Sequence, residues 1–343
     1  MGAASFAVLE RGLSIVYLES AMCRHKAGQM TATLLAILLG STASRAIPPK
    51  VRVTAKGLEV ERVSTECPII YDNDWWSDIP DDAYLWAKAS LGQCDLRANI
   101  VSRDMWEWRK GYKFSMDQCM KQCRTLLQQA RASGLRSIPD PIAGSSQALQ
   151  RPASGRIADT KFQRTPGSDC IVAEAKKATP AKPLLVFCGG PCTTVACAYL
   201  TDPSIAKRMI VFQIDGGGYN GKDSWSWQIV QQHCVFANWA HGYFWPKVGK
   251  WDPKRFDSLP RNPLCDALRK YARTGLAAAN QWGDGPWILW LFDRRCLTSA
   301  KLWNKTAITV PKEGTNLKAM ADEFFKTMAD PAVYRSVKPD TKR

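Results

Sequence analysis

Short apolar runs alternate with helical patterns along the chain from about residue 68 to residue 291. Uninterrupted apolar runs are typical of buried strands, whereas apolar residues that recur every three or four positions indicate helices. The apolar runs predict strands at Pro68–Tyr71, Leu96–Ser102, Leu184–Phe187 and Met209–Ile214. The helical patterns predict helices at Ala83–Leu91, Met116–Ala132, Asp169–Lys177, Thr194–Leu200 and Pro263–Ala279, the third of them with Ser168 as its N-cap.

This alternation predicts an α/β fold, a single domain with a mostly parallel sheet and flanking helices. We expect the domain to span residues 68–314, after a polar lead-in over 47–67 and before a C-terminal helix and tail over 315–343. Ligands of open parallel sheets bind beyond the C-terminal ends of the strands, so site residues are expected directly after the predicted strands.

The first 46 residues differ from the rest. Residues 22–46 contain a basic segment, a short apolar core and a small-residue end, which is the order of a secretory signal peptide. The piece before Met22 fits no part of such a signal and indicates a misassigned start. The protein is therefore expected to be secreted or periplasmic, or cytoplasmic if residues 22–46 are not a signal. The apolar core is too short to span a bilayer, so no membrane span is expected.

The composition of the chain limits which binding partners and metal sites are expected. The chain of 343 residues carries a formal charge of +16, but its basic residues are scattered, which favours a solvated basic surface over nucleic-acid binding. With three histidines, any metal should be bound by oxygen or by cysteine. The twelve cysteines lack the paired spacing of a zinc site, and export would permit some of them to form disulfides.

A cluster of carboxylates follows the first predicted strand. Five acidic residues lie within eleven positions: Asp72, Asp74, Asp78, Asp81 and Asp82. Mutual repulsion in such a cluster is relieved by a cation or a charged substrate, and hard oxygen ligands indicate Ca²⁺ or Mg²⁺. The alternative is a solvated acidic loop whose last two carboxylates stabilise a helix N-terminus.

The pattern Asp72-x-Asp74 followed by Asp81-Asp82-Ala83 resembles the aspartate signature of the nucleoside hydrolases, in particular their divergent nucleoside hydrolase-like branch. Three later blocks agree in order: 189–196 is similar to the family's Gly-Pro-Leu-Thr-Asn turn, 216–219 to its Gly-Gly-Gly loop, and 283–286 to the segment with the last metal-binding aspartate. The resemblance covers residues 68–291 and implies a nucleoside hydrolase-like fold.

The resemblance implies a Ca²⁺-dependent hydrolase, with Mg²⁺ as a possible substitute, that cleaves the N-glycosidic bond of a ribonucleoside or related N-riboside. Asp74 would bind the metal and accept a proton from the attacking water. Asp82, Asp284 and the backbone carbonyl of Gly189 would complete the protein ligands of the metal. Asp72 would not bind the metal itself but would help to orient the residues that do.

The same resemblance implies the sugar-binding residues. Asp81 would accept a hydrogen bond from the ribose 2′-hydroxyl, Asp284 would also face the substrate, and Asn238 would match the family's sugar-binding asparagine. Trp75 and Trp76 flank the acidic loop and are expected to contact the ligand, with core packing as the alternative.

The residues expected to face the nucleobase of the substrate depart from the family pattern. The loop over 75–80 is expanded, Thr194 stands where asparagine is expected, and Gly283 replaces the histidine that often protonates the leaving base. His233 or His241 could supply that acid from another loop. The expected partner is therefore a small-molecule N-riboside or sugar, and the chain could form a homo-oligomer.

Two alternatives stay open at this point. A strand followed by Asp-x-Asp also begins the haloacid dehalogenase-like phosphatases, in which Asp72 would be the nucleophile and Asp74 the acid. That alternative leaves Asp81 and Asp82 unexplained. The protein could instead bind a sugar or glycoconjugate with Ca²⁺ and without catalysis, because the usual acid of the leaving group is missing.

Overall fold

The computed structural model describes seven ranges of the chain: 47–74, 79–103, 115–213, 220–239, 254–274, 285–303 and 305–334. The expected signal peptide, Trp75, Trp76, His241, Asp284 and the Gly216–Tyr219 block lie outside these ranges. Within them, no helix has both the length and the apolar character that a membrane crossing requires.

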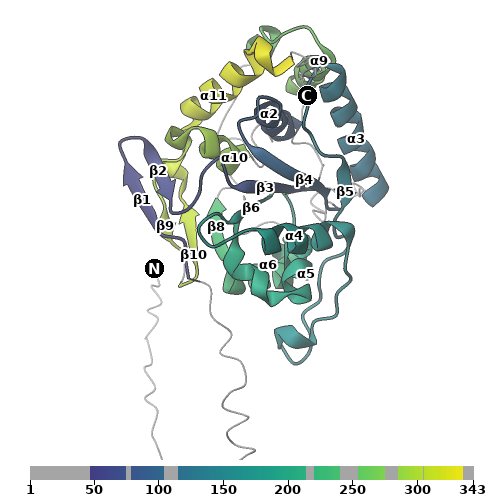
Figure 1. Ribbon diagram of the computed structural model, residues 1–343, viewed down its shortest axis with the longest axis vertical. Helices are drawn as coiled ribbons and strands as arrows, with labels where there is room; N and C mark the ends of the chain where they lie inside the picture. The colour runs from purple at the N-terminus through teal and green to yellow at the C-terminus, as the bar shows by residue number, and fades with distance from the viewer. Residues whose placement is uncertain are drawn as a thin grey trace, which may run out of the picture. The chain divides into compact units, whose positions relative to one another are not determined.

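An eight-stranded sheet forms the centre of the fold, in the order β5-β4-β3-β6-β7-β8-β10-β9 (Figure 1). All neighbouring strands are parallel except the edge pair β9 and β10. The prediction of a mostly parallel sheet is confirmed. The strands are β3 (Pro68–Asn73), β4 (Asp95–Val101), β5 (Pro141–Ala143), β6 (Leu184–Cys188), β7 (Met209–Gln213), β8 (Val235–Trp239), β9 (Lys301–Leu302) and β10 (Ala307–Val310).

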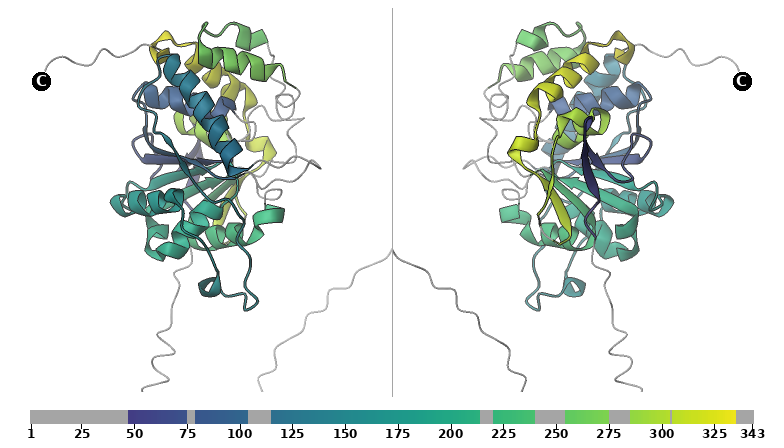
Figure 2. Two further views of the ribbon diagram at one scale, coloured as in Figure 1. Left: turned by 90° about the vertical axis from the view of Figure 1, so that its right-hand side faces the viewer. Right: turned by 90° about the vertical axis from the view of Figure 1, so that its left-hand side faces the viewer.

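Helices cover both faces of the sheet (Figures 1 and 2). One layer contains α4 (Pro166–Lys177), α5 (Thr193–Thr201) and α6 (Asn220–His233). The other contains α2 (Ile79–Ser90), α3 (Met116–Ala132), α8 (Lys254–Asp257), α9 (Pro263–Ala272), α10 (Gly285–Phe292) and α11 (Leu317–Ala329). Because both faces are buried, a central strand is apolar along most of its length. In β6, Leu185 and Phe187 face one core, whereas Leu184 and Val186 face the other.

Segments near the two ends of the domain pack against the layer that contains α2, α10 and α11. β1 (Val51–Thr54) and β2 (Gly57–Val60) form an antiparallel hairpin in the 47–67 segment, and the Leu58 N–H donates to the Leu297 carbonyl at 2.7 Å. Lys88 of α2 forms a buried ion pair with Glu323 of α11 at 2.7 Å, and the Tyr84 hydroxyl donates to the same carboxylate at 3.0 Å. The C-terminal helix is therefore tied to the helix that carries Asp81 and Asp82.

Helix α4 begins three residues earlier than the sequence predicts. Its N-cap is Thr165, and Ser168 is instead the third helical residue. The Thr165 hydroxyl accepts from the Ser168 N–H at 3.1 Å, while the Ser168 hydroxyl accepts from the Thr165 N–H at 2.8 Å. This reciprocal capping box pairs the backbone N–H groups of Thr165 and Ser168. Proline at the first helical position has no N–H to pair.

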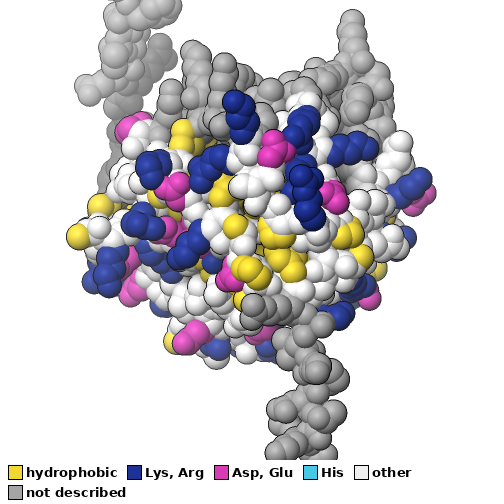
Figure 3. Space-filling view, turned by 90° about the horizontal axis from the view of Figure 1, so that it is seen from above, with side chains coloured by type: hydrophobic (Ala, Val, Ile, Leu, Met, Phe, Trp, Pro, Cys, Tyr) yellow, Lys and Arg dark blue, Asp and Glu magenta, His cyan; other side chains and the backbone are white. Residues whose placement is uncertain are grey.

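Charged side chains of both signs are mixed on the face seen from above in Figure 1. Figure 3 shows Lys and Arg side chains dispersed across this face, with Asp and Glu side chains between them. Among the described residues, several ion pairs join exposed side chains that are close in sequence, such as Arg156 with Asp159 and Arg164 with Asp169. On this face the positive charge is distributed and not concentrated in one patch.

Candidate functional site

Four buried carboxylates flank the point where β3 ends and α2 begins. Asp72 belongs to the end of β3, Asp74 follows it directly, and Asp81 and Asp82 lie in the first turn of α2. None of the four is more than 2% exposed. The two on α2 are favoured there by the partial positive charge of a helix N-terminus. The structure thus gathers the acidic cluster inside the protein and excludes a solvated loop for these four residues.

Asp72 is held by hydroxyl groups. The Ser102 hydroxyl at the end of β4 donates to Asp72 Oδ1 at 2.6 Å and lies 2.7 Å from the Thr194 hydroxyl of α5. Asp72 Oδ2 has no hydrogen-bond partner within the described ranges. The pKa of Asp72 is raised to about 7, because burial and the nearby Asp223 outweigh the hydrogen bonds from Ser102 and Thr194 that lower it. A positive charge nearby would therefore stabilise the ionised form of Asp72.

The predicted Gly-Pro turn lies against the acidic cluster. The Gly189 N–H donates to the Asp72 carbonyl at 2.8 Å, which continues the pairing of β3 with β6. The next residue, Gly190, approaches Asp74 so closely that a Cβ on Gly190 would lie 3.1 Å from Asp74 Oδ2. Gln213 at the end of β7 donates to the Gly190 carbonyl at 3.1 Å. The structure thus brings Asp74 and Gly189, which were expected to share a metal, to the same place.

Asp81 and Asp82 have different neighbours. The Asn73 side-chain amide donates to the two carboxylate oxygens of Asp82 at 3.3 and 3.5 Å. Gly285, at the start of α10, lies against Asp81: a Cβ there would be 2.3 Å from Asp81 Oδ1. Asp284 precedes Gly285 in the sequence and is outside the described ranges. The start of α10 therefore packs directly on the carboxylate expected to bind the ribose.

A row of buried polar side chains crosses the sheet at the level of Asp72. Residues in register on neighbouring strands point to the same face of a sheet, and the register joins Asp72, Cys188, Gln213, Asn238 and Thr309. Within the described ranges, four of these side chains have polar atoms without a hydrogen-bond partner: Asp72 Oδ2, Gln213 Oε1, both amide atoms of Asn238 and Thr309 Oγ1.

Such a row is unusual because buried polar atoms in folded proteins are nearly always hydrogen-bonded. Each unpaired group costs about 1–3 kcal/mol when it is removed from water. Asn238, which is 0% exposed, matches the expected sugar-binding asparagine. Gln213, Thr309 and Ser102 belong to no recognisable motif, and only their place at or near a strand end could have indicated them.

Asp223 is a further buried carboxylate near this site that the motifs did not indicate. It lies at a kink in α6 and accepts hydrogen bonds from the hydroxyls of Thr193, at 2.8 Å, and of Ser226. Backbone groups of Leu149 and Thr193 also hydrogen-bond to it. Burial raises the pKa of Asp223 to about 6, although these hydrogen bonds lower it. Asp223 therefore fastens α6 to the start of α5 and to the segment before α4.

His233 cannot supply the missing acid. It lies at the last residue of α6, just before β8 begins, whereas the carboxylates gather where the strands end. Its ring stacks on Tyr199 with centroids 5.0 Å apart, and burial lowers the pKa of its imidazole. The structure thus corrects the role expected for His233.

The donor chemistry of the site fits a hard divalent cation. The four buried carboxylates and the backbone at Gly189 offer oxygen ligands, which Ca²⁺ and Mg²⁺ prefer. Asp72 forms no ion pair with Lys or Arg within the described ranges, so its charge has no counter-charge there. In those ranges no three His, Cys, Asp or Glu side chains are spaced to hold a metal. Asp284, the third expected carboxylate, lies outside them.

Comparison with known proteins places the fold. No protein-family model matches the sequence, and no curated protein matches it in sequence. A purine-preferring ribonucleoside hydrolase from Gardnerella vaginalis superposes over 78% of this chain and 100% of its own, with a TM-score of 0.57 and 13% identity. A plant nucleoside hydrolase superposes over 77% of this chain and 99% of its own, with a TM-score of 0.53 and 12% identity.

A nucleoside hydrolase-related protein from Saccharophagus degradans, associated with carbohydrate metabolism, is also similar. The match covers 79% of this chain and 72% of that protein, with a TM-score of 0.51 and 15% identity. The identities are low, so the comparison concerns the fold. It favours the resemblance seen in the aspartate signature over the phosphatase alternative. The chain has the nucleoside hydrolase fold.

Proposed function

We propose that this protein is a Ca²⁺-dependent hydrolase that cleaves the N-glycosidic bond of a ribonucleoside or related N-riboside. The observation that supports this most is the meeting of two features at one edge of the sheet. Four buried carboxylates adjoin a row of buried polar side chains that have unpaired atoms. A cation would offset the charge of the first group, and a ligand rich in hydroxyls would satisfy the second.

The metal would be held by Asp74, Asp82, Asp284 and the carbonyl of Gly189. A bound divalent cation supplies charge that lowers the pKa of water and fixes vicinal hydroxyls by chelation. The contact of Asn73 with Asp82 orients that carboxylate, because both of its oxygens accept from one amide group. The close approach of Gly190 to Asp74 limits the movement of that side chain.

The protein side chains would then act on the sugar and the water. Asp74 accepts a proton from the water that attacks the anomeric carbon. Asp81 accepts a hydrogen bond from the ribose 2′-hydroxyl, and Asn238 binds another sugar hydroxyl. Breaking the N-glycosidic bond places positive charge on the ring, which nearby buried carboxylates stabilise. Asp72, held by Ser102, contributes to this negative field.

The part of the site that would face the leaving group departs from the family pattern. His233 lies at the other edge of the sheet, so it is not the acid that protonates a departing base. A substrate whose leaving group departs without protonation should therefore react most readily. We expect p-nitrophenyl β-D-ribofuranoside to be cleaved faster than inosine or uridine.

The assay that tests this function measures ribose and p-nitrophenolate release by the full chain with Ca²⁺. Asp74→Asn is the matched inactive variant, and its loss of activity should be about a hundredfold or more, as for removal of a general base. Asp140→Asn is the control, because Asp140 pairs with Arg131 at the surface with its side chain 79% exposed. Equal turnover by both variants would refute the assignment.

A second candidate is a non-catalytic, Ca²⁺-dependent sugar-binding protein. The position of His233 favours it, because the described part of the chain then contributes no histidine to the site. The two functions differ in a single experiment. Free ribose should raise the melting temperature in both cases, but only the hydrolase releases p-nitrophenolate from the riboside.

A further inference from the structure

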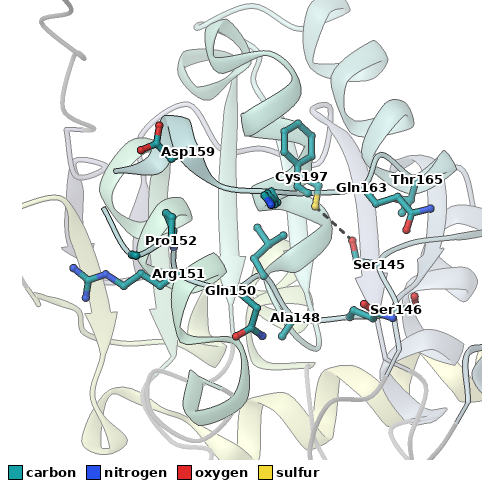
Figure 4. Close-up of a pocket in the computed structure, with 15 residues that line it drawn as sticks. Ser145, Ser146, Ala148, Gln150, Arg151, Pro152, Asp159, Gln163, Thr165 and Cys197 are labelled. Atoms are coloured by element: carbon teal, nitrogen blue, oxygen red, sulfur yellow. Dashed lines mark hydrogen bonds between the residues drawn. The ribbon is translucent and has the colours of Figure 1, made fainter. Parts of the chain in front are cut away.

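A cavity of about 590 Å³ lies between the segment joining β5 to α4 and the helix α5 (Figure 4). Its walls come from residues 145–153 and 159–165 and from Cys197. None of these residues belongs to the candidate site. The volume is within the range of about 300–1,000 Å³ that is typical of small-molecule binding sites.

The walls of this cavity are fixed by hydrogen bonds. The Ser145 N–H donates to the Thr194 hydroxyl at 2.9 Å, and the Ser145 hydroxyl contacts the Cys197 sulfur at 3.8 Å. The Trp225 indole N–H donates to the Thr160 hydroxyl at 2.9 Å. Buried groups thus hold this long segment at both of its ends. The cavity therefore exists without a ligand to organise it.

Two cations line the cavity and have no carboxylate partner in the described ranges. The Arg151 guanidinium lies over the Trp225 ring, 5.3 Å from its centroid, and forms no ion pair there. Lys161 forms neither an ion pair nor a side-chain hydrogen bond in those ranges. The acidic residue of the wall, Asp159, is already occupied by Arg156 at 2.8 Å and by Ser154 at 2.6 Å. The cavity is therefore positively charged.

The remaining lining offers neutral hydrogen-bonding groups and one aromatic face. The side-chain amides of Gln147, Gln150 and Gln163 have no hydrogen-bond partner in the described ranges. Figure 4 shows Gln150 and Gln163 on different sides of the space, with Arg151 beyond the former. Phe162 exposes 37% of its surface, so an aromatic ring is available to a flat ligand or a sugar face.

We propose that this cavity binds a small phosphorylated ligand of the sugar phosphate or nucleotide class. The phosphate would be held by Arg151 and Lys161, because charge-assisted hydrogen bonds to a guanidinium and an ammonium are the strongest available there. The amides would bind hydroxyl groups, and Phe162 would pack on the ring of the sugar or base. Arg151 is pre-positioned by Trp225, which reduces the entropy lost on binding.

Isothermal titration calorimetry on the full chain tests this site. The probes are ribose 5-phosphate, AMP and inorganic phosphate, with ribose and adenosine as uncharged counterparts. The test variant is R151Q/K161Q. The control K121Q/R124Q removes the same charge from the exposed side of α3, on the opposite face of the sheet. K161Q alone serves as a second variant because Lys161 is exposed and its loss should not affect folding.

The expected result is that a phosphorylated probe binds the wild type and that R151Q/K161Q weakens this binding by about tenfold or more, as the loss of charge-assisted contacts predicts. The control should bind as the wild type does. Tighter binding of ribose 5-phosphate or AMP than of phosphate identifies an organic phosphate; equal binding identifies free phosphate.

Three results would overturn the proposal: equal weakening in the control, no binding of any phosphorylated probe, or binding that Asp74→Asn abolishes and R151Q/K161Q preserves. The last would place the ligand in the candidate catalytic site. Because the readout is binding, the experiment stays informative if the chain hydrolyses no riboside.

Discussion

The backbone of Gly190 lies directly against the side chain of Asp74. A Cβ on Gly190 would be 3.0 Å from the carboxyl carbon of Asp74 and only 2.8 Å from its Cβ, and the second distance is shorter than real Cβ atoms show. Glycine at this position is therefore required by a neighbour that lies 116 positions earlier, at the end of another strand. The contact locks together the two segments that were expected to bind one metal.

Gly190→Ala should disturb both stability and the site. The added methyl group must displace Asp74 or the turn, and overpacking of this kind costs about 1–3 kcal/mol. Urea unfolding should show this loss, and calorimetry should show weaker Ca²⁺ binding. Gly92→Asn is the control, because a Cβ at Gly92 meets nothing within 4 Å and asparagine tolerates its φ of +68°. A Gly190→Ala variant with wild-type stability and Ca²⁺ affinity would contradict the contact.

The central strands could be predicted from the sequence because both of their faces are buried. β3, β6 and β7 each contain at least four consecutive apolar or aromatic residues, and β4 ends in Ile100 and Val101, so their position did not depend on knowing the partners. β8 was missed because Asn238 breaks its apolar run, and β5 because it has three residues. In both cases the strand is defined by the neighbour with which it pairs, and that pairing is absent from any local pattern.

The same distinction applies to the site. Asp72, Asp74, Asp81 and Asp82 lie close together in sequence, so a local motif could identify them. Their supports could not be identified in this way. Ser102 and Thr194 lie 92 positions apart and meet only because β4 ends where α5 begins. The proposed roles of Trp75, Trp76 and Asp284 stay predictions, because these residues lie outside the described ranges.

Asp223 should give the protein a specific pH dependence. Burial raises its pKa to about 6 from an ordinary value of 3.8, so the folded state binds this proton more tightly than the unfolded state. Between about pH 4 and pH 6, ionisation therefore lowers the stability of the wild type relative to a variant without the group, by on the order of 3 kcal/mol at most. Above about pH 7 the difference should be constant.

The comparison is among wild type, Asp223→Asn and Asp202→Asn in urea unfolding from pH 2 to pH 8. Asp202→Asn gives the opposite sign, because hydrogen bonds from Lys176 and Ser204 lower the pKa of Asp202 to about 2. Wild type should therefore gain stability over that variant as pH rises from about 2 to about 4. A flat difference between wild type and Asp223→Asn across pH 4–7 would show that Asp223 is not buried as described.

Ca²⁺ should stabilise the protein through the acidic cluster. A ligand that binds only the native state adds about 3 kcal/mol at a hundredfold excess over its dissociation constant. EDTA should therefore lower the melting temperature, and Asp82→Asn should remove most of this response. Asp140→Asn should keep it, since Asp140 is exposed and far from the cluster in sequence. A melting temperature that is indifferent to Ca²⁺, Mg²⁺ and EDTA would exclude the metal site and with it the proposed hydrolase.

Asn238 and Asn99 form a matched pair that separates a ligand-binding amide from a structural one. Both are at most 1% exposed and lie in central strands of the sheet. Asn99 accepts a hydrogen bond from the Trp86 indole at 3.0 Å and donates to the Pro139 carbonyl at 2.7 Å. Neither amide atom of Asn238 has a partner within the described ranges.

Replacement by leucine should therefore have opposite consequences at the two positions. Asn99→Leu removes two buried hydrogen bonds and should lower the free energy of unfolding by about 2–5 kcal/mol. Asn238→Leu breaks no hydrogen bond within the described ranges and replaces an unpaired amide with an apolar group of similar size, so stability should change by less than about 1 kcal/mol. Because an amide that binds a sugar hydroxyl is lost, ribose should bind at least about tenfold more weakly. Urea unfolding and calorimetry with ribose measure the two effects, and a large loss of stability with intact ribose binding in Asn238→Leu would assign Asn238 to the structure instead of the site.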